Sequence, residues 1–484
     1  MSTPKKTWFL ERAKKFFFYP VQSDLFYNIF AMTEGKLLAA FEKVEITPRY
    51  SVHLGGYFNK RVSEGVLDPL HMRLAALSDG EHRFLFIQVE NCAISTPDAE
   101  DIRNRIARES EYQKHEIMLF TSHIHTGPDL IGFFGLPKEK RYLEDLKRMV
   151  VEAAVRLNPQ ASVSLSFARA TYERLAYNRR WVMKGGGVVT NPPKNSTERL
   201  RPEGSVDREA NTIVFKDEGG RIQALFVNIS NHTDTIGGNM ISADWPGFME
   251  RHLNKLLETD IPVFLFLAPQ GNINHFEFES ERAQTNYQEA QRLGRAYAEI
   301  VASSLTHLKP LSLKGGASPA QSLEAREILL PIPARKISAA EIEKAEEILS
   351  RKEGRKENQG RPLTAEDLAK NHATVEWLFA RELVELAKNM PKNYRVPLQA
   401  VKLGSVAFAA IPGEPFVEVG LELKNIAPFE LVFPVALANG YFGYIPLRKN
   451  FGRGGYETRT SSASFLAEDA ADRILEAFRF LLAF

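Results

Sequence analysis

Two histidines that follow an apolar stretch are the most distinctive chemical feature of the sequence. His123 and His125 lie in Thr-Ser-His-Ile-His-Thr-Gly-Pro-Asp, directly after the apolar run 116–121, which we expect to be a strand. Alternate residues at the end of a strand point to the same side, so both imidazoles can face one cleft. A His-x-His pair at a strand end can equally be structural, and the pair alone does not decide between these roles.

Two further strand ends carry side chains that bind metals. His232 follows the apolar run 222–229, and Glu414 follows another apolar run at a Pro-Gly turn. Two histidines and a carboxylate are the ligands of an open catalytic zinc centre, and open α/β sheets bind ligands at the carboxyl ends of their strands. Cys92 is the single cysteine, which excludes a site made of several thiolates. Glu414 can alternatively cap the helix expected to begin near Phe416.

Other polar candidates lie in loops, where structural roles are equally compatible with the pattern. Asn274 follows a buried apolar run, Arg179 lies in Tyr-Asn-Arg-Arg-Trp, and Tyr444 and Tyr456 lie near glycines. The sequence contains no Gly-x-Ser-x-Gly motif for a serine nucleophile. Gly-Gly-Gly at 185–187 is not followed by an expected helix, so it does not match a dinucleotide-binding loop.

The elements that must position these residues alternate between strands and helices. Continuous apolar strands separated by helices predict an α/β fold with a mixed, largely parallel sheet covered by helices. The expected strands are 84–90, 116–121, 222–229 and 263–267, and the expected helices include 97–110 and 137–157.

Residues 335–392 break this rhythm. They are rich in Glu, Lys, Arg and Ala, and glycines separate two helical stretches. We interpret them as a helical insertion, either a lid or an oligomer contact, within a single domain that covers residues 31–484, rather than as an independent domain.

Composition describes an ordinary globular chain. The 484 residues are 44% hydrophobic and 25% charged, and 62 Lys and Arg against 60 Asp and Glu leave a net charge of +2. Because the charges nearly cancel, the protein has no overall positive potential that would attract nucleic acid. No apolar run approaches the roughly 20 residues of a membrane-spanning helix, and no cleavable leader pattern is visible. We therefore expect a cytoplasmic protein.

Residues 1–30 differ from the rest in composition. Five Lys or Arg and one Glu are interleaved with Trp8 and the aromatic run 16–19. Such a basic amphipathic segment can make a peripheral membrane contact. The alternative is that the aromatic side chains pack on the protein's own domain or on a subunit neighbour.

The ordered set of motifs resembles the neutral, non-lysosomal ceramidase family, zinc-dependent amidases that cut the N-acyl bond of sphingolipids. The similarity runs from Glu-Ile-Thr-Pro at 45–48 to Gly-Gly-Tyr-Glu at 454–457 and includes the His-x-His-Thr-Gly-Pro and Pro-Gly-Glu motifs. The resemblance implies one zinc ion and assigns a role to each matching residue. The implied zinc ligands are His123, His232, Glu414 and Tyr444, and the residues that bind and polarise the amide are His125, Arg179 and Tyr456.

The sequence also departs from the family. Asn274 stands where ceramidases have a serine, and we place it in substrate binding because zinc-activated water needs no serine nucleophile. The sequence shows neither the family's C-terminal immunoglobulin-like domain nor its export signal. We expect a cytoplasmic relative that cleaves another small N-acyl or lipid-like amide. The alternatives are a metal-dependent esterase or phosphoesterase, and a catalytically inactive lipid-binding protein.

Overall fold

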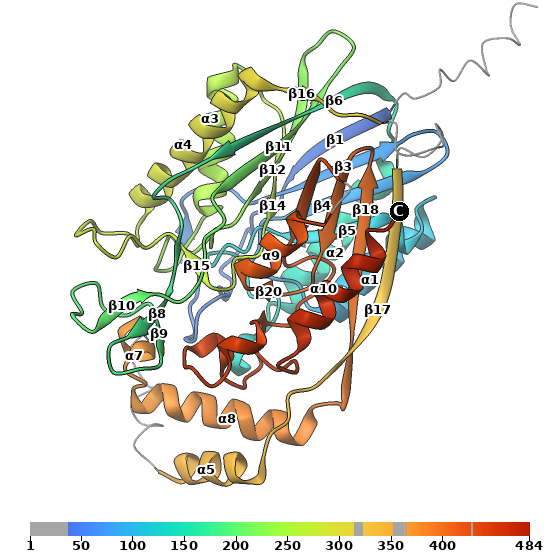
Figure 1. The fold of residues 1–484 in the computed structure, drawn as a ribbon. Coiled ribbons are helices and arrows are strands. Elements are labelled where there is room, and N and C mark those ends of the chain that lie inside the picture. The colour runs from blue at the N-terminus through green and yellow to red at the C-terminus, as the bar shows by residue number, and fades with distance from the viewer. Residues whose placement is uncertain (1–36, 314–322, 352–362, 364, 427–428) are drawn as a thin grey trace, which may run out of the picture. The chain divides into compact units, whose positions relative to one another are not determined.

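A nine-stranded mixed sheet forms the centre of the fold (Figure 1). The computed structural model describes residues 37–313, 323–351, 363, 365–426 and 429–484, so the basic segment 1–30 lies outside the described residues. The strand order is β14-β12-β11-β6-β1-β3-β4-β5, with β16 paired to β6. The strands are β1 (Leu37–Glu45), β3 (His71–Ser78), β4 (Arg83–Val89), β5 (Ile117–Thr121), β6 (Ala161–Thr171), β11 (Glu209–Lys216), β12 (Ile222–Ile229), β14 (Val263–Leu267) and β16 (Lys309–Pro310).

The sheet is mixed, as the sequence predicts, but the expectation of a largely parallel sheet is wrong. Among its described strands, the parallel pairs are β4–β5 and β12–β14, which lie at its two ends, and the other pairs are antiparallel. Short connections, 79–82 between β3 and β4 and 217–221 between β11 and β12, join antiparallel neighbours directly. The apolar runs that suggested parallel strands reflect burial on both faces, which does not depend on strand direction.

A second sheet packs against one face of the large sheet. Its order is β17 (Leu323–Pro333), β18 (Asn393–Leu403), β19 (Val406–Ala410) and β21 (Leu431–Val435), and β19 and β21 are parallel. Phenylalanines fill the space between the sheets: the ring centroids of Phe86 and Phe408 are 4.9 Å apart, and those of Phe266 and Phe433 are 5.8 Å apart. These fully buried rings form the centre of the apolar core.

Helices cover the outer faces of the two sheets and complete four layers. Apolar residues of α1 (Thr96–Glu109) and α2 (Lys140–Arg156) pack on β3, β4 and β5, and those of α3 (Asp244–Leu257) and α4 (Tyr287–Ser304) pack on β11, β12 and β14. The small sheet is covered by α9 (Val417–Lys424) and α10 (Ala470–Leu481). The predicted helical cover is therefore present. The second sheet lies between the large sheet and the helices α9 and α10 (Figure 1).

The helical insertion connects β17 to β18. Its described helices are α5 (Ala339–Ser350), α7 (Ala365–Ala369) and α8 (Ala373–Asn389). One face of α8 packs on α5 through Ala380 and Val384, while Phe379 on another face contacts Phe58 and Phe134. The insertion therefore packs through α8 on loop residues of the rest of the domain, and α5 packs on the other face of α8.

Short strand pairs fasten the loops that surround the carboxyl ends of the long strands. Glu414–Pro415 (β20) is parallel to Tyr444–Ile445 (β22), and Ile273–Asn274 (β15) is antiparallel to Tyr177–Asn178 (β7). The remaining short strands are β2 (Gly65–Val66), β8 (Arg180–Met183), β9 (Val188–Thr190), β10 (Arg199–Pro202) and β13 (Met240–Ile241).

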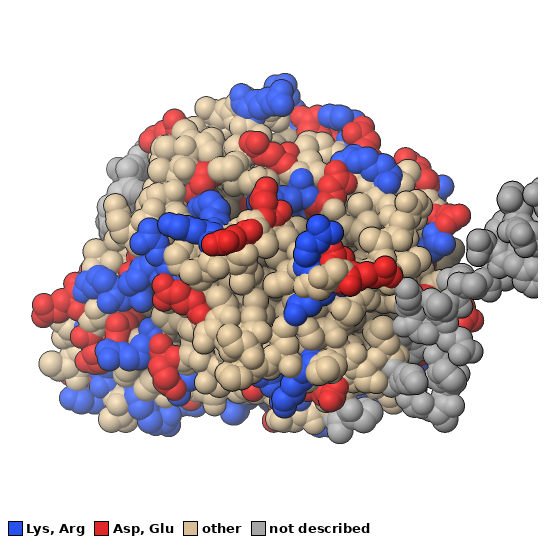
Figure 2. Space-filling view, turned by 90° about the horizontal axis from the view of Figure 1, so that it is seen from above, with Lys and Arg blue, Asp and Glu red and all other residues tan. Residues whose placement is uncertain are grey.

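The charged surface mixes both signs on the face drawn in Figure 2, where the Lys and Arg of the described residues alternate with Asp and Glu. None of the described helices combines the length and the apolar character needed to cross a bilayer.

Asn439 links the two sheets behind the loops. It is fully buried and left-handed, with φ of 59°. Its Oδ1 accepts the backbone N–H of Leu119 in β5 at 3.0 Å, and its Nδ2 donates to Oε1 of Gln399 in β18 at 2.9 Å. One side chain therefore satisfies buried polar groups of both sheets.

We predict that Asn439→Ala lowers the free energy of unfolding by about 1–3 kcal/mol, because a buried N–H and a buried amide lose their partners. Urea denaturation measures the change. Asn389→Ala, at the exposed end of α8, is the matched control and should change stability by less than about 0.5 kcal/mol. Equal denaturation midpoints for the two variants would contradict the link.

Candidate metal centre

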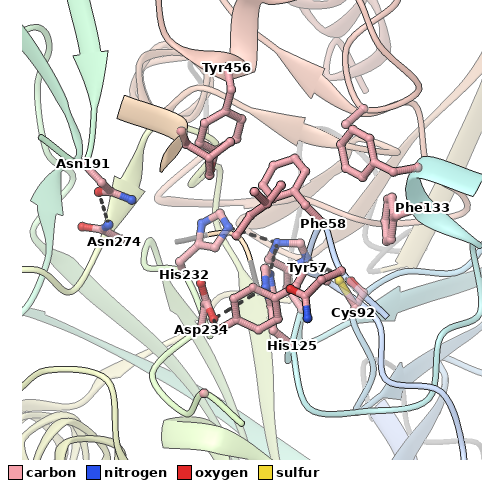
Figure 3. Close-up of a pocket in the computed structure, with 18 of the residues that line it drawn as sticks. Tyr57, Phe58, Cys92, His125, Phe133, Asn191, His232, Asp234, Asn274 and Tyr456 are labelled. Carbon is pink, nitrogen blue, oxygen red and sulfur yellow. Dashed lines mark hydrogen bonds and ion pairs between the residues drawn. The ribbon is translucent and has the colours of Figure 1, made fainter. Parts of the chain in front are cut away.

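Three strand ends bring two histidines and a glutamate together. The chain leaves β5 towards His123, β12 towards His232 and β19 towards Glu414. Each of these strands is one partner of a parallel pair, so its following loop leaves at the same edge as the loop of its partner strand. The ligand atoms that the three loops carry lie within 4.8 Å of one another. Figure 3 shows His232 beside His125 at the floor of the resulting pocket.

The donor atoms of these three residues face one another. Nε2 of His123 lies 3.2 Å from Nε2 of His232 and 3.2 Å from Oε2 of Glu414. Nε2 of His232 lies 3.6 Å from the same oxygen. All three side chains are at most 2% exposed, and their donor atoms lie within 4.8 Å of one another. The group has the composition and spacing of a metal site.

The route by which His123 and His125 reach one cleft differs from the predicted strand alternation. Strand β5 ends at Thr121, and His123 is left-handed with φ of 62°. The backbone therefore turns before the first histidine, and the turn sets both rings side by side, with Nε2 of His125 3.3 Å from Nε2 of His123. A histidine held at positive φ is uncommon and is found where surrounding structure enforces it.

The far side of each imidazole is held by a backbone carbonyl. Nδ1 of His123 lies 2.9 Å from the carbonyl oxygen of Cys92, and Nδ1 of His232 lies 3.3 Å from that of Gln270. A carbonyl oxygen can only accept a hydrogen bond, so these contacts favour a proton on Nδ1. In the neutral imidazole, Nε2 then carries the lone pair that can bind a cation.

Glu414 supplies the observation that tests whether a metal fits. Its Oε1 accepts the Tyr441 hydroxyl at 2.9 Å, while its buried Oε2 makes no well-aligned hydrogen bond among the described residues and lies 3.2 Å and 3.6 Å from the two imidazole Nε2 atoms. A buried carboxylate oxygen without a well-aligned donor is costly. A divalent cation among Oε2 and the two imidazoles satisfies it, and this donor set suits zinc.

The same arrangement shifts the pKa values of the two imidazoles in opposite directions. Burial disfavours a charged His123, but the Glu414 carboxylate outweighs burial and raises the pKa of this imidazole well above its usual range. Burial together with the Arg179 cation lowers the pKa of His232 far below its usual range. One imidazole thus carries a proton opposite Glu414 while the other is neutral.

Tyr444 lies beside Glu414 because β20 and β22 pair these two residues directly. Burial and the nearby carboxylate raise the pKa of Tyr444 well above its usual range, so its phenol keeps its proton. The tyrosine lines the same pocket as the two histidines and Glu414. Its role as a fourth ligand stays a prediction.

His125 belongs to the same group but is turned towards other partners. Its Nδ1 lies 3.6 Å from Oδ1 of Asp234, which also accepts the Tyr57 hydroxyl. Burial lowers the pKa of His125 well below its usual range, so this imidazole is neutral. Sequence reasoning singled out neither Tyr57 nor Asp234, although Asp234 follows His232 by two positions.

The glycine that precedes Tyr57 allows this approach. Gly56 is left-handed with φ of 92°, and a Cβ at this position would lie 2.5 Å from the His125 ring. A side chain here would displace either the loop or the imidazole.

Arg179 lies next to His232 and is held in place by hydrogen bonds to other residues. Its Nε donates to Glu457 at 3.0 Å and its Nη2 to the carbonyl oxygen of Gly271 at 2.7 Å. Its Nη1 lies 3.4 Å from Nε2 of His232, and its guanidinium carbon lies 5.3 Å from the centre of the Tyr456 ring. The fixed guanidinium places a permanent cation at the pocket floor.

The pocket holds every candidate site residue of the sequence analysis. Its volume is about 440 Å³, a size suited to a small organic ligand. Asn274 lines it too, and its Nδ2 donates to Oδ1 of Asn191 at 2.7 Å (Figure 3). Its role in substrate binding stays a prediction.

Cys92 forms a second group of potential ligands with His123 and His125. Burial raises the pKa of its thiol, which disfavours the thiolate that binds metal. His123 belongs to both groups, and its Nδ1 faces the Cys92 carbonyl oxygen. We therefore regard the His123, His232 and Glu414 group as the better metal site.

Comparisons with known proteins identify the fold. The sequence matches no family model, and no curated protein matches it. Solved structures do match: a ceramidase complexed with C2 has a TM-score of 0.66 and 14% identity over 92% of this chain and 74% of its own. The neutral ceramidase from Pseudomonas aeruginosa has a TM-score of 0.66 and 15% identity, with the same coverage. The fold is ceramidase-like. The resemblance inferred from the motifs is thus confirmed for the fold.

We predict one zinc ion per chain at His123, His232 and Glu414. His123→Ala removes one imidazole, and zinc content should fall from about one ion to near zero. Elemental analysis of dialysed protein measures it. His82→Ala is the control, because His82 follows β3 on a turn outside the pocket and should leave the zinc content unchanged. Equal zinc in the His123 variant and the unchanged protein would refute this ligand set.

Zinc binding should also release a proton. Because Glu414 raises the pKa of His123, the protonated imidazole is favoured, and its proton must leave before this residue binds a metal. We expect proton release on zinc binding at pH 7, and zinc affinity that rises with pH. Calorimetry in buffers of different ionisation enthalpy measures the release. A binding enthalpy independent of the buffer would contradict it.

Proposed function

We propose that the protein is a zinc-dependent hydrolase that cleaves the amide bond of a lipid-like N-acyl substrate. The observation that carries the proposal is the buried Oε2 of Glu414, which lies within 3.6 Å of the Nε2 atoms of His123 and His232 and makes no well-aligned hydrogen bond among the described residues. The ceramidase-like fold supports an amide as the bond that is cut. The pocket is large enough for a small acylated amine.

The proposed cofactor is zinc, held by His123, His232 and Glu414, with Tyr444 as a further candidate ligand. When bound in such a site, zinc lowers the pKa of water to about 7 and polarises carbonyl oxygens.

Arg179 and Tyr456 stabilise negative charge on the carbonyl oxygen. Arg179 is fixed by Glu457, so its remaining N–H groups need no reorganisation during the reaction. Burial raises the pKa of Tyr456, and its phenol therefore stays protonated and can donate a hydrogen bond. Both groups line the pocket, and Nη1 of Arg179 lies 3.4 Å from Nε2 of His232.

His125 moves the proton. Its lowered pKa keeps the ring neutral, so Nε2 can accept a proton and pass it to the departing amine. The imidazolium that forms lies 3.6 Å from the Asp234 carboxylate, which stabilises the transient charge. Tyr57 holds Asp234 in this position by donating its hydroxyl.

We predict unequal effects of substitutions at Tyr456 and Asn274. Tyr456→Phe removes one preorganised donor and should lower kcat by about 100- to 1,000-fold with little change in KM. Asn274→Ala should change kcat/KM by about tenfold or less, because its amide is bonded to Asn191 and supplies no nucleophile. Turnover is measured as free fatty acid and free amine released from N-acyl substrates by the zinc-loaded protein.

Tyr394→Phe is the control for loss of a phenol, since Tyr394 lies on β18 outside the pocket. An Asn274→Ala protein as inactive as Tyr456→Phe would contradict the proposed division of roles. Release of an alcohol from an acyl ester, or of phosphate from a phosphoester, without release of amine from the N-acyl substrates would instead identify an esterase or a phosphoesterase.

A further inference from the structure

A row of aromatic rings runs from the candidate metal ligands to the helical insertion. The ring centroids of Tyr444 and Tyr456 are 5.8 Å apart, and those of Tyr456 and Phe58 are also 5.8 Å apart. The Phe58 ring then lies 4.6 Å from Phe134 and 6.2 Å from Phe379. All five rings line the pocket, so one of its walls is a continuous apolar surface (Tyr456 and Phe58 in Figure 3).

The insertion forms the far end of this wall. Phe379 comes from α8 and Leu368 from α7, and both line the pocket. The wall is fixed in place: Arg381 of α8 donates to the carbonyl oxygen of Phe134, and the Arg459 guanidinium lies 4.1 Å from the centre of the Phe379 ring.

The pocket also has a polar wall. Asn191 and Asn274 are hydrogen-bonded to each other there, and Asp234 accepts the Tyr57 hydroxyl (Figure 3). The Asp234 side chain is 29% exposed and faces His125. A substrate that spans the pocket therefore meets apolar groups on one side and hydrogen-bonding groups on the other.

The proton-transfer geometry decides which end of the substrate lies on which wall. The departing nitrogen must lie within reach of His125, and Asp234 flanks that imidazole on the polar side. The amine part therefore faces Asp234, and the acyl part follows the aromatic row away from the metal ligands.

We propose that the aromatic row and the insertion bind one acyl chain, and that Leu368 sets the chain length that is accepted. Resting on the proposed function, this makes the substrate a single-chain N-acyl amine with a small polar amine part. Leu368 and Tyr456 also border a neighbouring cavity of about 500 Å³, lined by Val188, Val189 and Val375 among others. The size of the side chain at position 368 therefore controls how far a chain extends.

The test compares Leu368→Trp and Leu368→Ala in the full-length, zinc-loaded protein. The probes are saturated N-acylethanolamines of 4 and 16 acyl carbons for kcat/KM, and hexadecanoic acid for equilibrium binding by calorimetry. Leu383→Ala is the matched control, because Leu383 lies on α8 but packs towards α5. Thermal unfolding verifies that each variant is folded.

We expect Leu368→Trp to lower kcat/KM for the 16-carbon substrate at least tenfold and to leave the 4-carbon substrate within twofold. Each methylene that loses its apolar contact accounts for about a fourfold loss. Hexadecanoic acid should bind at least tenfold more weakly to Leu368→Trp, and Leu368→Ala and Leu383→Ala should retain binding.

Unchanged chain-length selectivity in a protein that hydrolyses both probes would overturn the acyl wall and leave the proposed function intact. Equal losses for both chain lengths in Leu368→Trp would also overturn it. Conversely, Leu368-dependent binding of hexadecanoic acid without hydrolysis of either probe would support the acyl wall and reject the proposed reaction.

Discussion

The buried carboxylate of Glu414 is the interaction on which the rest of the site depends. Its Oε2 makes no well-aligned hydrogen bond among the described residues, and removing such a charge from water costs several kcal/mol unless an opposite charge is near. The nearby Oε2 favours a proton on His123, and the Tyr441 hydroxyl donates a hydrogen bond to Oε1. In the proposed site a divalent cation, held by Glu414, His123 and His232, would supply the positive charge in place of that proton. The loops around Glu414 are therefore organised for a positive charge.

Four packed layers hold these loops in conformations that they would not adopt alone. His123, Asp244, Leu437 and Asn439 all have positive φ, which is unfavourable for residues other than glycine. Asp244 receives the backbone N–H groups of Thr235 and Ile236, and Asn439 receives that of Leu119. The Asp244 hydrogen bonds tie the loop that carries His232 to the start of α3, and the Asn439 hydrogen bond ties the loop after β21 to β5. Strain of this kind is typical of functional sites.

The candidate ligands were predictable from the sequence because each follows an apolar run that is long enough to be a buried strand. His123, His232 and Glu414 needed only the rule that ligands bind at carboxyl strand ends. The pairing direction was not predictable, since a strand buried on both faces has the same pattern in parallel and antiparallel sheets. The second sheet was missed because the apolar pattern of a strand does not show to which sheet the strand belongs.

Contacts between distant segments were beyond sequence reasoning. Asp234 meets His125 only after β5 and β12 are placed in one sheet, and Phe379 meets Phe58 only after the insertion packs on the core. Tyr444 was assigned by the resemblance, and its place beside Glu414 comes from a two-residue strand pair that is too short to predict. The position of these residues depends on tertiary packing rather than on local propensity.

The most direct measurement is hydrolysis of an N-acylethanolamine by the zinc-loaded protein in water enriched in ¹⁸O, with the released fatty acid examined by mass spectrometry after one turnover. Attack of water on the amide carbon predicts one ¹⁸O atom in the carboxylate, free ethanolamine in equal amount, and neither product with His123→Ala. Fatty acid without ¹⁸O, or products at the same rate from the His123 variant, would contradict a metal-dependent amide hydrolase.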